Sequence, residues 1–535
     1  MKSKFKIGIV LHSLQQQDSI CDLMQWLESN PNISIEYFLV KKNIESIPDF
    51  LFNSLKAIKN FSWKCLTLIE KTYYKKLFNS SSSSIFTPQN IHILDDCLLR
   101  SNSFISSDFF EELRRKDIDL FFQLTSDSSV SNICDASKYG ILSIYGLSAS
   151  KNKEKYPLAF DEVLSKSDKT GFSLIHQEPQ TLDLKIIYEA AFPTHNYFYA
   201  NNENLLNRRN FYIKQNISFF IDNKFFQNNF MHLLSLDDIP EAPNISDQYK
   251  YLIIIMYRFF IKALKKIFFK QSQWSVGFFH SDWKNLQFSS ANVIANPDNC
   301  YLADPFIFSQ NERDYCFLEE YSFDNKLGAI CVYDLTDSKP VRLGYAIQES
   351  FHMSFPYIFT FKDKIYMVPE TSANNDIRIY ESIQFPLKWK LKNILMKDIF
   401  AVDSMIFLYD EIWWLFTNIN PDNGTDACSD LSIFSSSNPL SNQWRPHIMN
   451  PVIVDSARAR NGGILFDDKN IYRVSQKQKF DMYGGEFMIN KIKTLNSEKY
   501  SESTEYSMPP DLLIDFKAAH HCHSNGKITV FDFLK

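Results

Sequence analysis

Acidic residues recur in the second half of the chain, beside short strand-like segments. Asp304 and Asp403 stand near the start of two such segments, and Glu319, Glu320 and Glu370 end the segments that follow. Carboxylates gathered in one cleft can make or break a glycosidic bond, because one carries a proton as the acid while another stays ionised as base or nucleophile. The same groups can also bind a sugar without reaction, or serve only the fold. The residues alone leave these three roles open.

These acids belong to a repeat with a period of roughly 50 residues, which is typical of a β-propeller. In such a blade the second strand runs antiparallel to the first and returns to the face where the first began. We therefore expect all five carboxylates at one mouth of the central channel. The first strands are expected at 303–308, 354–359, 402–407 and 461–466, and the second strands at 315–320, 364–370, 412–417 and 471–476.

The first half of the chain has a different pattern, in which strand-like and helical stretches alternate. This alternation predicts an open parallel α/β sheet over residues 1–200. Residues 201–275 are expected to form a helical connector. Residues 276–535 are expected to form the propeller, whose last strand, 527–532, is expected to pair with a strand at its beginning and so remove exposed sheet edges.

Composition limits the classes of function and the compartment. The chain has 535 residues and a net charge of −5, so it lacks the basic footprint of a nucleic-acid-binding protein. Its nine cysteines are irregularly spaced without a CxxC pair, and the N-terminus reads as a strand rather than a signal peptide, so we expect a cytoplasmic protein. No P-loop or GxGxxG motif occurs, and no cofactor is expected.

One segment, 249–270, combines an apolar run with basic residues. The charges interrupt it too often for a helix that spans a membrane. We favour a helix packed on one face between domains. The alternative is a basic amphipathic helix in peripheral contact with an anionic membrane, such as a bacterial inner membrane.

Several motifs of the first half resemble tetrahydrofolate-dependent formyltransferases, over about residues 1–190. They are 139–148, 157–160, 170–175 and the pair Leu182-Asp183. That family has an Asn-x-His motif, and here Ser143 and Tyr145 occupy the two positions. Formyl transfer needs a proton acceptor, and a tyrosine with a pKa near 10 performs that task poorly at neutral pH. The resemblance therefore implies a degenerate site of Ser143, Tyr145 and Asp183, in a domain that binds a ligand or serves assembly.

A second resemblance covers about residues 275–535 and rests on motifs that recur in order. They are 304–306, 318–320, 352–356, 368–374, 403–404, 413–417, 450–452 and 456–463. They resemble the N-terminal domain of plant glucosamine inositolphosphorylceramide transferases, a domain that bacteria also use behind a formyltransferase-like domain in surface-glycan assembly. That domain is similar in turn to five-bladed propellers of glycoside hydrolase family 43, so the resemblance implies five blades for residues 276–535. The likeness implies an acidic catalytic set, for which Asp304, Glu370 and Asp403 are the best matches.

Other polar residues are expected to bind the substrate. Arg458 and Arg460 could hold a phosphate or carboxylate through paired hydrogen bonds, or instead form a salt bridge between blades. Glu319, Glu320, His352 and His521 complete the expected substrate-binding set. In the run 520–523 only His521 and His523 share a strand face, and no second ligand pair occurs at zinc-like spacing, so no metal is expected.

The sequence therefore predicts a carbohydrate-active protein of surface-glycan or glycolipid assembly, with glycosidic-bond chemistry at the propeller mouth. Its expected partners are a sugar, a nucleotide-sugar or a glycosyl-lipid. A non-catalytic glycan-binding or scaffolding protein is the alternative, and a sugar N-formyltransferase with an altered site is the second alternative.

Overall fold

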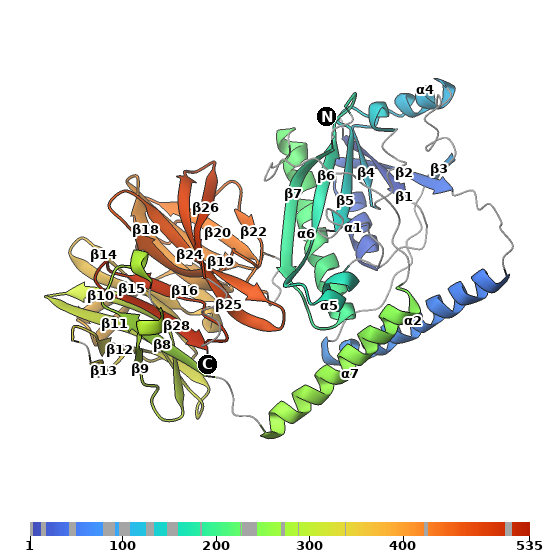
Figure 1. The fold of residues 1–535 in the computed structure, drawn as a ribbon. Coiled ribbons are helices and arrows are strands. Elements are labelled where there is room, and N and C mark those ends of the chain that lie inside the picture. The colour runs from blue at the N-terminus through green and yellow to red at the C-terminus, as the bar shows by residue number, and fades with distance from the viewer. Residues whose placement is uncertain are drawn as a thin grey trace. The chain divides into compact units, whose positions relative to one another are not determined.

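The computed structural model divides the chain into two compact units, Met1–Lys266 and Ile267–Lys535 (Figure 1). The structure describes residues 4–11, 18–41, 50–78, 91–95, 107–124, 133–146, 159–181, 184–224, 226, 243–268, 273–286, 288–337, 339–421, 426–508 and 516–534.

The first unit is built on a seven-stranded mixed sheet in the order β3-β2-β1-β4-β5-β6-β7. Strands β1 to β5 are parallel, as expected, whereas β5, β6 and β7 pair antiparallel. The predicted α/β sheet is confirmed, and it is mixed because the hairpin of β6 and β7 extends the parallel strands with antiparallel pairing at this edge. The strands are β1 (Phe5–Leu11), β2 (Ile33–Lys41), β3 (Ile91–Asp95), β4 (Leu120–Gln123), β5 (Ile141–Gly146), β6 (Lys169–Gln177) and β7 (Leu184–Pro193).

Within the described residues, this unit contains the helices α1 (Asp18–Ser29), α2 (Phe50–Phe78), α4 (Ser107–Arg115), α5 (Phe160–Ser165), α6 (Phe198–Asn223) and α7 (Ile245–Phe268). Helix α6 packs against α1, α2, α5 and β6. The stretch 201–275, expected to be a connector, thus adds α6 and nearly all of α7 to the first unit.

The second unit is a five-bladed propeller, as predicted, with each blade an antiparallel sheet. Blade 1 contains β10 (Cys300–Gln310), β11 (Arg313–Ser322), β12 (Leu327–Asp334) and β13 (Val341–Ile347). Blade 2 contains β14 (Ser354–Phe361), β15 (Lys364–Glu370), β16 (Asp376–Gln384) and β17 (Lys388–Lys397). Blade 3 contains β18 (Ala401–Tyr409), β19 (Ile412–Ile419), β20 (Asp430–Ser436), β21 (Arg445–Pro446) and β22 (Ile453–Val454).

Blade 4 contains β23 (Asn461–Phe466), β24 (Ile471–Lys479), β25 (Met482–Leu495) and β26 (Tyr500–Ser507). Blade 5 combines the two ends of the unit, with β27 (Cys522–Ser524) and β28 (Thr529–Leu534) beside β8 (Trp274–Phe279) and β9 (Asn292–Ile294). The predicted closure is confirmed, since β28 pairs antiparallel with β8 from Thr529–Phe279 to Leu534–Trp274. Short 3-10 helices lie at Trp283–Asn285, Phe288–Ser290 and Ser372–Asn374.

Candidate active site at one end of the propeller

The innermost strands of the five blades contact one another around a closed ring. Four of them begin with an irregularity of the same kind, at Ala303/Phe306, Ser354/Tyr357, Val402/Met405 and Asn461/Gly463. The bulge puts Asp304, Phe355 and Asp403 at φ of 49°, 46° and 50°. This left-handed backbone is strained for residues other than glycine, and such strain and such bulges concentrate at functional sites. Blade 2 thus has a phenylalanine where blades 1 and 3 have aspartate.

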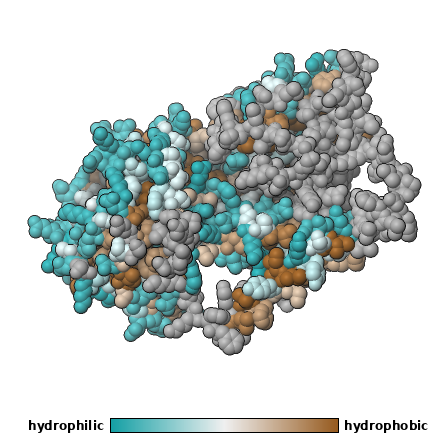
Figure 2. Space-filling model, viewed as in Figure 1, coloured by the Kyte–Doolittle hydropathy of each residue, from teal (hydrophilic) through white to brown (hydrophobic). Residues whose placement is uncertain are grey.

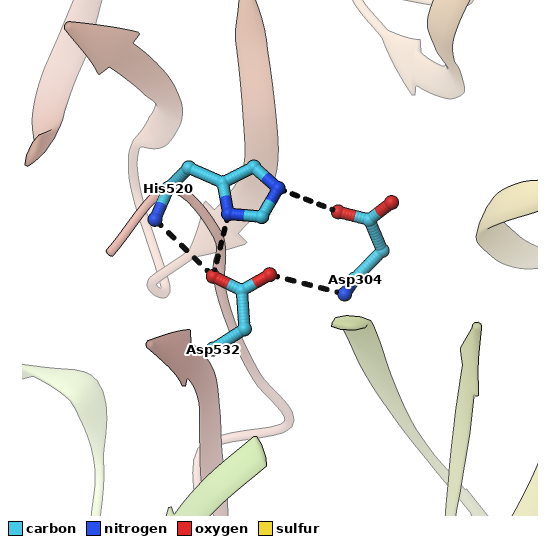
Figure 3. Close-up of side chains that lie close together, drawn as sticks. All are labelled: Asp304, His520 and Asp532. Carbon is cyan, nitrogen blue, oxygen red and sulfur yellow. Dashed lines mark hydrogen bonds and ion pairs between the residues drawn. The ribbon is translucent and has the colours of Figure 1, made fainter. Parts of the chain in front are cut away.

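Asp304 lies in a buried network with two residues of blade 5, His520 and Asp532 (Figure 3). His520 Nε2 lies 3.3 Å from Asp304 Oδ1, and His520 Nδ1 lies 2.9 Å from Asp532 Oδ1. Asp532 also accepts hydrogen bonds from the backbone N–H groups of Asp304, His520 and His521 at 3.0–3.2 Å. Asp532 therefore ties the start of β10 to the segment before β27.

His520 is the cation of this network. Although burial lowers the pKa of His520, the carboxylates of Asp532 and Asp304 raise it to about 10. The rings of Trp274 and Tyr483 cover the imidazole, with centroids 4.2 Å and 5.4 Å away. A protonated His520 thus offsets the negative charge of Asp304.

A pH titration of stability should detect this cation. The folded-state pKa of His520 lies above its usual value of 6.5, so its stabilisation is complete below pH 6.5 and is lost as pH rises through about 10. The difference in unfolding free energy between wild type and His520→Gln is expected to shrink by a few kcal/mol over that window. His447→Gln is the matched control, because His447 is a buried propeller histidine whose pKa burial lowers. If the difference in unfolding free energy between wild type and His520→Gln stays constant over this pH window, His520 is not the cation of the network.

Three ligand-type atoms of Asp304, His520 and Asp532 lie within 4.8 Å of one another, a spacing that a metal ion could use. Both oxygens of Asp532 already accept backbone N–H groups, and both ring nitrogens of His520 face carboxylates. The three side chains therefore form an ion-pair network with one another, although His520 Nδ1 makes no hydrogen bond. Of the two histidines weighed for a metal, His523 accepts a hydrogen bond from the Ile307 amide through Nδ1 at 3.3 Å.

Asp403 is held by Arg460, which precedes the innermost strand of the next blade. Arg460 Nε donates to Asp403 Oδ2 at 2.7 Å, and Gln476 Nε2 donates to the same oxygen at 3.1 Å. Burial lowers the pKa of Arg460, but Asp403 and further neighbours, among them Tyr483 and Glu370, together raise it well above its usual range, so the guanidinium stays charged. Arg460 also lies 4.0 Å from Glu370 Oε2 and over the ring of Tyr483. The pair of Arg460 with Asp403 is therefore a salt bridge between blades, which was one of the two roles that the sequence left open for this arginine.

Glu319, near the end of β11, is 5% exposed and is influenced by the charges of Asp304 and Glu370. We call the acids Asp304, Glu319, Glu370 and Asp403 the carboxylate cluster. Burial raises the pKa of Glu319 well above its usual range, and the charges of Asp304 and then Glu370 raise it further. Its Oε1 lies 3.5 Å from His352 Nε2. Since His352 Nδ1 accepts the Gly328 amide at 2.9 Å and burial lowers the pKa of this histidine, the ring is neutral with its proton on Nε2. The raised pKa of Glu319 comes from burial and from the charges of Asp304 and Glu370, and it favours the protonated acid.

Glu370 ends β15, opposite Ser354 at the start of β14. Its Oε1 accepts a hydrogen bond from the Ser372 hydroxyl at 2.7 Å, and its side chain remains 10% exposed. His521 lies beside Asp304, with Nδ1 3.9 Å from Asp304 Oδ1, between the rings of Phe306 and Phe355. Burial lowers the pKa of His521 to about 3, so this ring is neutral.

Two expected site residues lie elsewhere in the propeller. Glu320 points away from Glu319 and binds Arg342 through two hydrogen bonds of 3.0 Å, with a further bond from Tyr345. Arg458 lies 3.7 Å from Asp455 rather than beside Arg460. Alternation along a strand explains the first separation, because neighbouring side chains point to opposite faces.

In the first unit, Ser143 and Tyr145 lie on β5 and are both buried. The Ser143 hydroxyl donates to Gln123 Oε1 at 3.0 Å, and Tyr145 packs with Ile175 and Ile186. Asp183, the third residue of the degenerate formyltransferase site, lies outside the described residues.

An open apolar pocket of about 560 Å³ lies at the other ends of two innermost strands and is separate from the carboxylate cluster. Its lining includes Tyr357, Phe359, Phe407 and Trp413, with Lys362 as its charged residue. It offers no acid for glycosidic chemistry.

Residues 284–510 match the family model described as "Glucosamine inositolphosphorylceramide transferase 1, N-terminal". Curated proteins called Glucosamine inositolphosphorylceramide transferase 1 are similar over the same part of the chain. The protein of Arabidopsis thaliana is 32% identical over 262 residues, which covers 43% of this chain and 34% of the relative. That of Oryza sativa subsp. japonica is 34% identical over 231 residues, covering 40% and 31%. The chain thus spans about a third of the length of these relatives.

Solved structures show more distant similarity. Zg3597, a family 117 glycoside hydrolase produced by Zobellia galactanivorans, has a TM-score of 0.34 at 11% identity, covering 49% of this chain and 90% of its own. The catalytic domain of a Coprinopsis cinerea GH62 α-L-arabinofuranosidase has a TM-score of 0.31 at 11% identity, covering 49% and 97%. Similarity at this level carries no inference about activity. It is by sequence that the propeller of this chain is similar to the N-terminal domain of glucosamine inositolphosphorylceramide transferases.

Proposed function

We propose that this chain is a carbohydrate-active protein that makes or breaks a glycosidic bond at the carboxylate end of the propeller. The observation that carries this proposal is the unequal environment of two neighbouring acids. Glu319 has a raised pKa, whereas Asp304 faces the cation of His520. Acids whose surroundings differ in this way are suited to opposite roles in glycosidic chemistry.

In this proposal Glu319 donates a proton to the leaving oxygen, and Asp304 acts as base or nucleophile. His352 and the His520–Asp532 pair are positioning residues, because they act through Glu319 and Asp304. Glu370 lies at the same end of the blades with part of its side chain exposed. It is the second candidate for the proton donor, while Asp403 and Arg460 shape the site between blades 3 and 4.

The proposed substrate is a sugar carried on a nucleotide or a lipid. The names of the curated relatives support this class, since each is called a glucosamine inositolphosphorylceramide transferase. The direct test incubates the full chain with nucleotide-sugars, glycosyl-lipids and aryl glycosides and detects products by mass spectrometry. A product that forms with wild type and is absent with Asp304→Asn supports the proposal. Equal amounts of product from wild type and from Asp304→Asn overturn it.

A non-catalytic glycan-binding role is the second candidate, favoured by the tight pairing of Asp403 with Arg460 and of Asp304 with His520. If binding is the whole function, substituting these carboxylates weakens the free energy of glycan binding by about 1.5–3 kcal/mol per lost charged hydrogen bond. In that case wild type forms no product with any of the substrates.

We predict that the first unit does not perform folate-dependent formylation. Tyr145 stands where the resemblance expects a histidine, and it packs with Ile175 and Ile186. Incubation of the full chain with a formyl-folate donor and amino-sugar nucleotides is expected to yield no formylated product by mass spectrometry. Formylation that disappears in Asp183→Ala would contradict this prediction.

A further inference from the structure

Helices α2 and α7 of the first unit expose a large set of apolar side chains. We call this set the apolar helix face. Ile69 is 71% exposed and Met256 is 64% exposed, and Figure 2 shows apolar residues gathered along α7. Contiguous apolar surface of this kind marks an interaction site on a soluble protein. Its members are Phe61, Leu68, Ile69 and Tyr73 of α2 with Tyr249, Leu252, Ile253, Met256, Tyr257, Phe259 and Phe260 of α7.

The exposed residues of α7 follow the spacing of a single helical stripe. Tyr249, Ile253, Met256 and Phe260 lie at intervals of four, three and four residues, so they share one side of the helix. Tyr251 lies on the other side, is 0% exposed, and packs against Phe160. The helix is therefore buried on one side and apolar on the other.

The two helices are joined firmly, so the exposure is not a result of loose packing. The Tyr251 hydroxyl donates to Glu70 of α2 and accepts the Phe198 amide at 2.6 Å. The Ser62 hydroxyl donates to Gln248 at 2.6 Å. Tyr73 and Phe259, from the two helices, form an edge-on ring pair at 5.9 Å. The apolar helix face thus belongs to two helices that contact each other directly.

The charges of α2 and α7 indicate which kind of partner binds the apolar helix face. Helix α2 carries six lysines, and α7 carries four lysines and an arginine, whereas each helix has a single acidic residue. Both acids, Glu70 and Asp247, are buried at 7% and 8% exposure. Lys64 is exposed, and Lys250 is exposed with its ammonium 3.2 Å from Asp247 Oδ1. An apolar face rich in Tyr and Phe and flanked by lysine fits the boundary between acyl chains and anionic headgroups.

We propose that α2 and α7 together dock the chain on an anionic lipid bilayer, with the apolar helix face inserted at the headgroup boundary. Within the residues that the structure describes, neither these helices nor any other is long and apolar enough to cross a membrane. The helix pair therefore lies in the plane of the surface. Docking concerns the first unit and does not depend on the chemistry proposed for the propeller.

The test uses the full chain and vesicles of phosphatidylcholine with or without phosphatidylserine, with binding measured by flotation. Wild type is expected to float with the anionic vesicles and far less with the neutral ones. Binding should weaken when salt rises from about 0.1 M to about 1 M, where the screening length falls from about 10 Å to about 3 Å. The variant Ile253→Gln/Met256→Gln/Phe260→Gln is expected to lose at least about tenfold in binding, because it removes the inserted apolar area and keeps helix-forming residues.

The matched control is Ile383→Gln/Ile448→Gln, which removes side chains that are 63% and 58% exposed on the propeller. It should bind vesicles like wild type, and circular dichroism should show that both variants are folded. A wild-type chain that stays with the solvent in the presence of anionic vesicles overturns the proposal. So does a wild-type dimer, seen by light scattering without vesicles, that the triple variant converts to a monomer, because a second copy would then cover the face.

Discussion

Glu319→Gln is expected to abolish turnover at the propeller site while the fold and most of the ligand affinity remain. Glutamine keeps the shape of the side chain and part of its hydrogen bonding but cannot donate the proton. The loss should amount to about 10²–10⁴-fold, the usual contribution of general acid catalysis. Asp304→Asn should cause a comparable loss, because the amide can serve neither as base nor as nucleophile. The rate is measured on the substrate that the screen identifies, and ligand affinity by calorimetry.

The matched control for Glu319 is its neighbour on the same strand. Glu320→Gln changes an acid that is equally buried but binds Arg342 and Tyr345 away from the cluster. We expect it to retain activity, and an equal loss in this variant would contradict the assignment. Glu370→Gln separates the two candidate donors. If Glu370 rather than Glu319 donates the proton, Glu370→Gln abolishes turnover and Glu319→Gln retains it.

Arg460→Met is expected to lower the free energy of unfolding of the propeller by about 3–5 kcal/mol, because it leaves the buried Asp403 carboxylate without its partner. Asp403 is 2% exposed, and Arg460 bridges it from the next blade at 2.7 Å. Arg458→Met is the matched control, since Arg458 lies 3.7 Å from Asp455 with a side chain 35% exposed. The control should change stability by no more than about 0.5 kcal/mol.

The double variant Asp403→Asn/Arg460→Met completes this test, with stability measured by denaturant unfolding. It removes both charges, so it is expected to be more stable than Arg460→Met alone. If Arg458→Met and Arg460→Met lower the free energy of unfolding equally, the ion pair between blades makes no specific contribution to stability.

The propeller and its closure could be predicted from the sequence because their signals are local and repeat. Each blade places apolar residues and turns at the same spacing, and the run 527–532 has the pattern of a further strand, which the structure pairs with β8. The same logic placed Asp304 at the start of a first strand and Glu319 at the end of a second, and the structure pairs Ala303 with Glu319. The local pattern also indicated the five parallel strands of the first unit.

Contacts between distant segments were decided only by the tertiary structure. Asp304 meets Asp532 across 228 positions of the chain, and His520 had no local signal that set it apart from His521. Arg460 and Arg458 are two residues apart, yet only blade packing brings Arg460 to Asp403. Likewise α7 was visible as an amphipathic helix, whereas its pairing with α2 depends on contacts such as Tyr251 with Glu70. Strand period and composition report which residues an element presents, but ion pairs, pKa shifts and shared surfaces depend on which elements fold together.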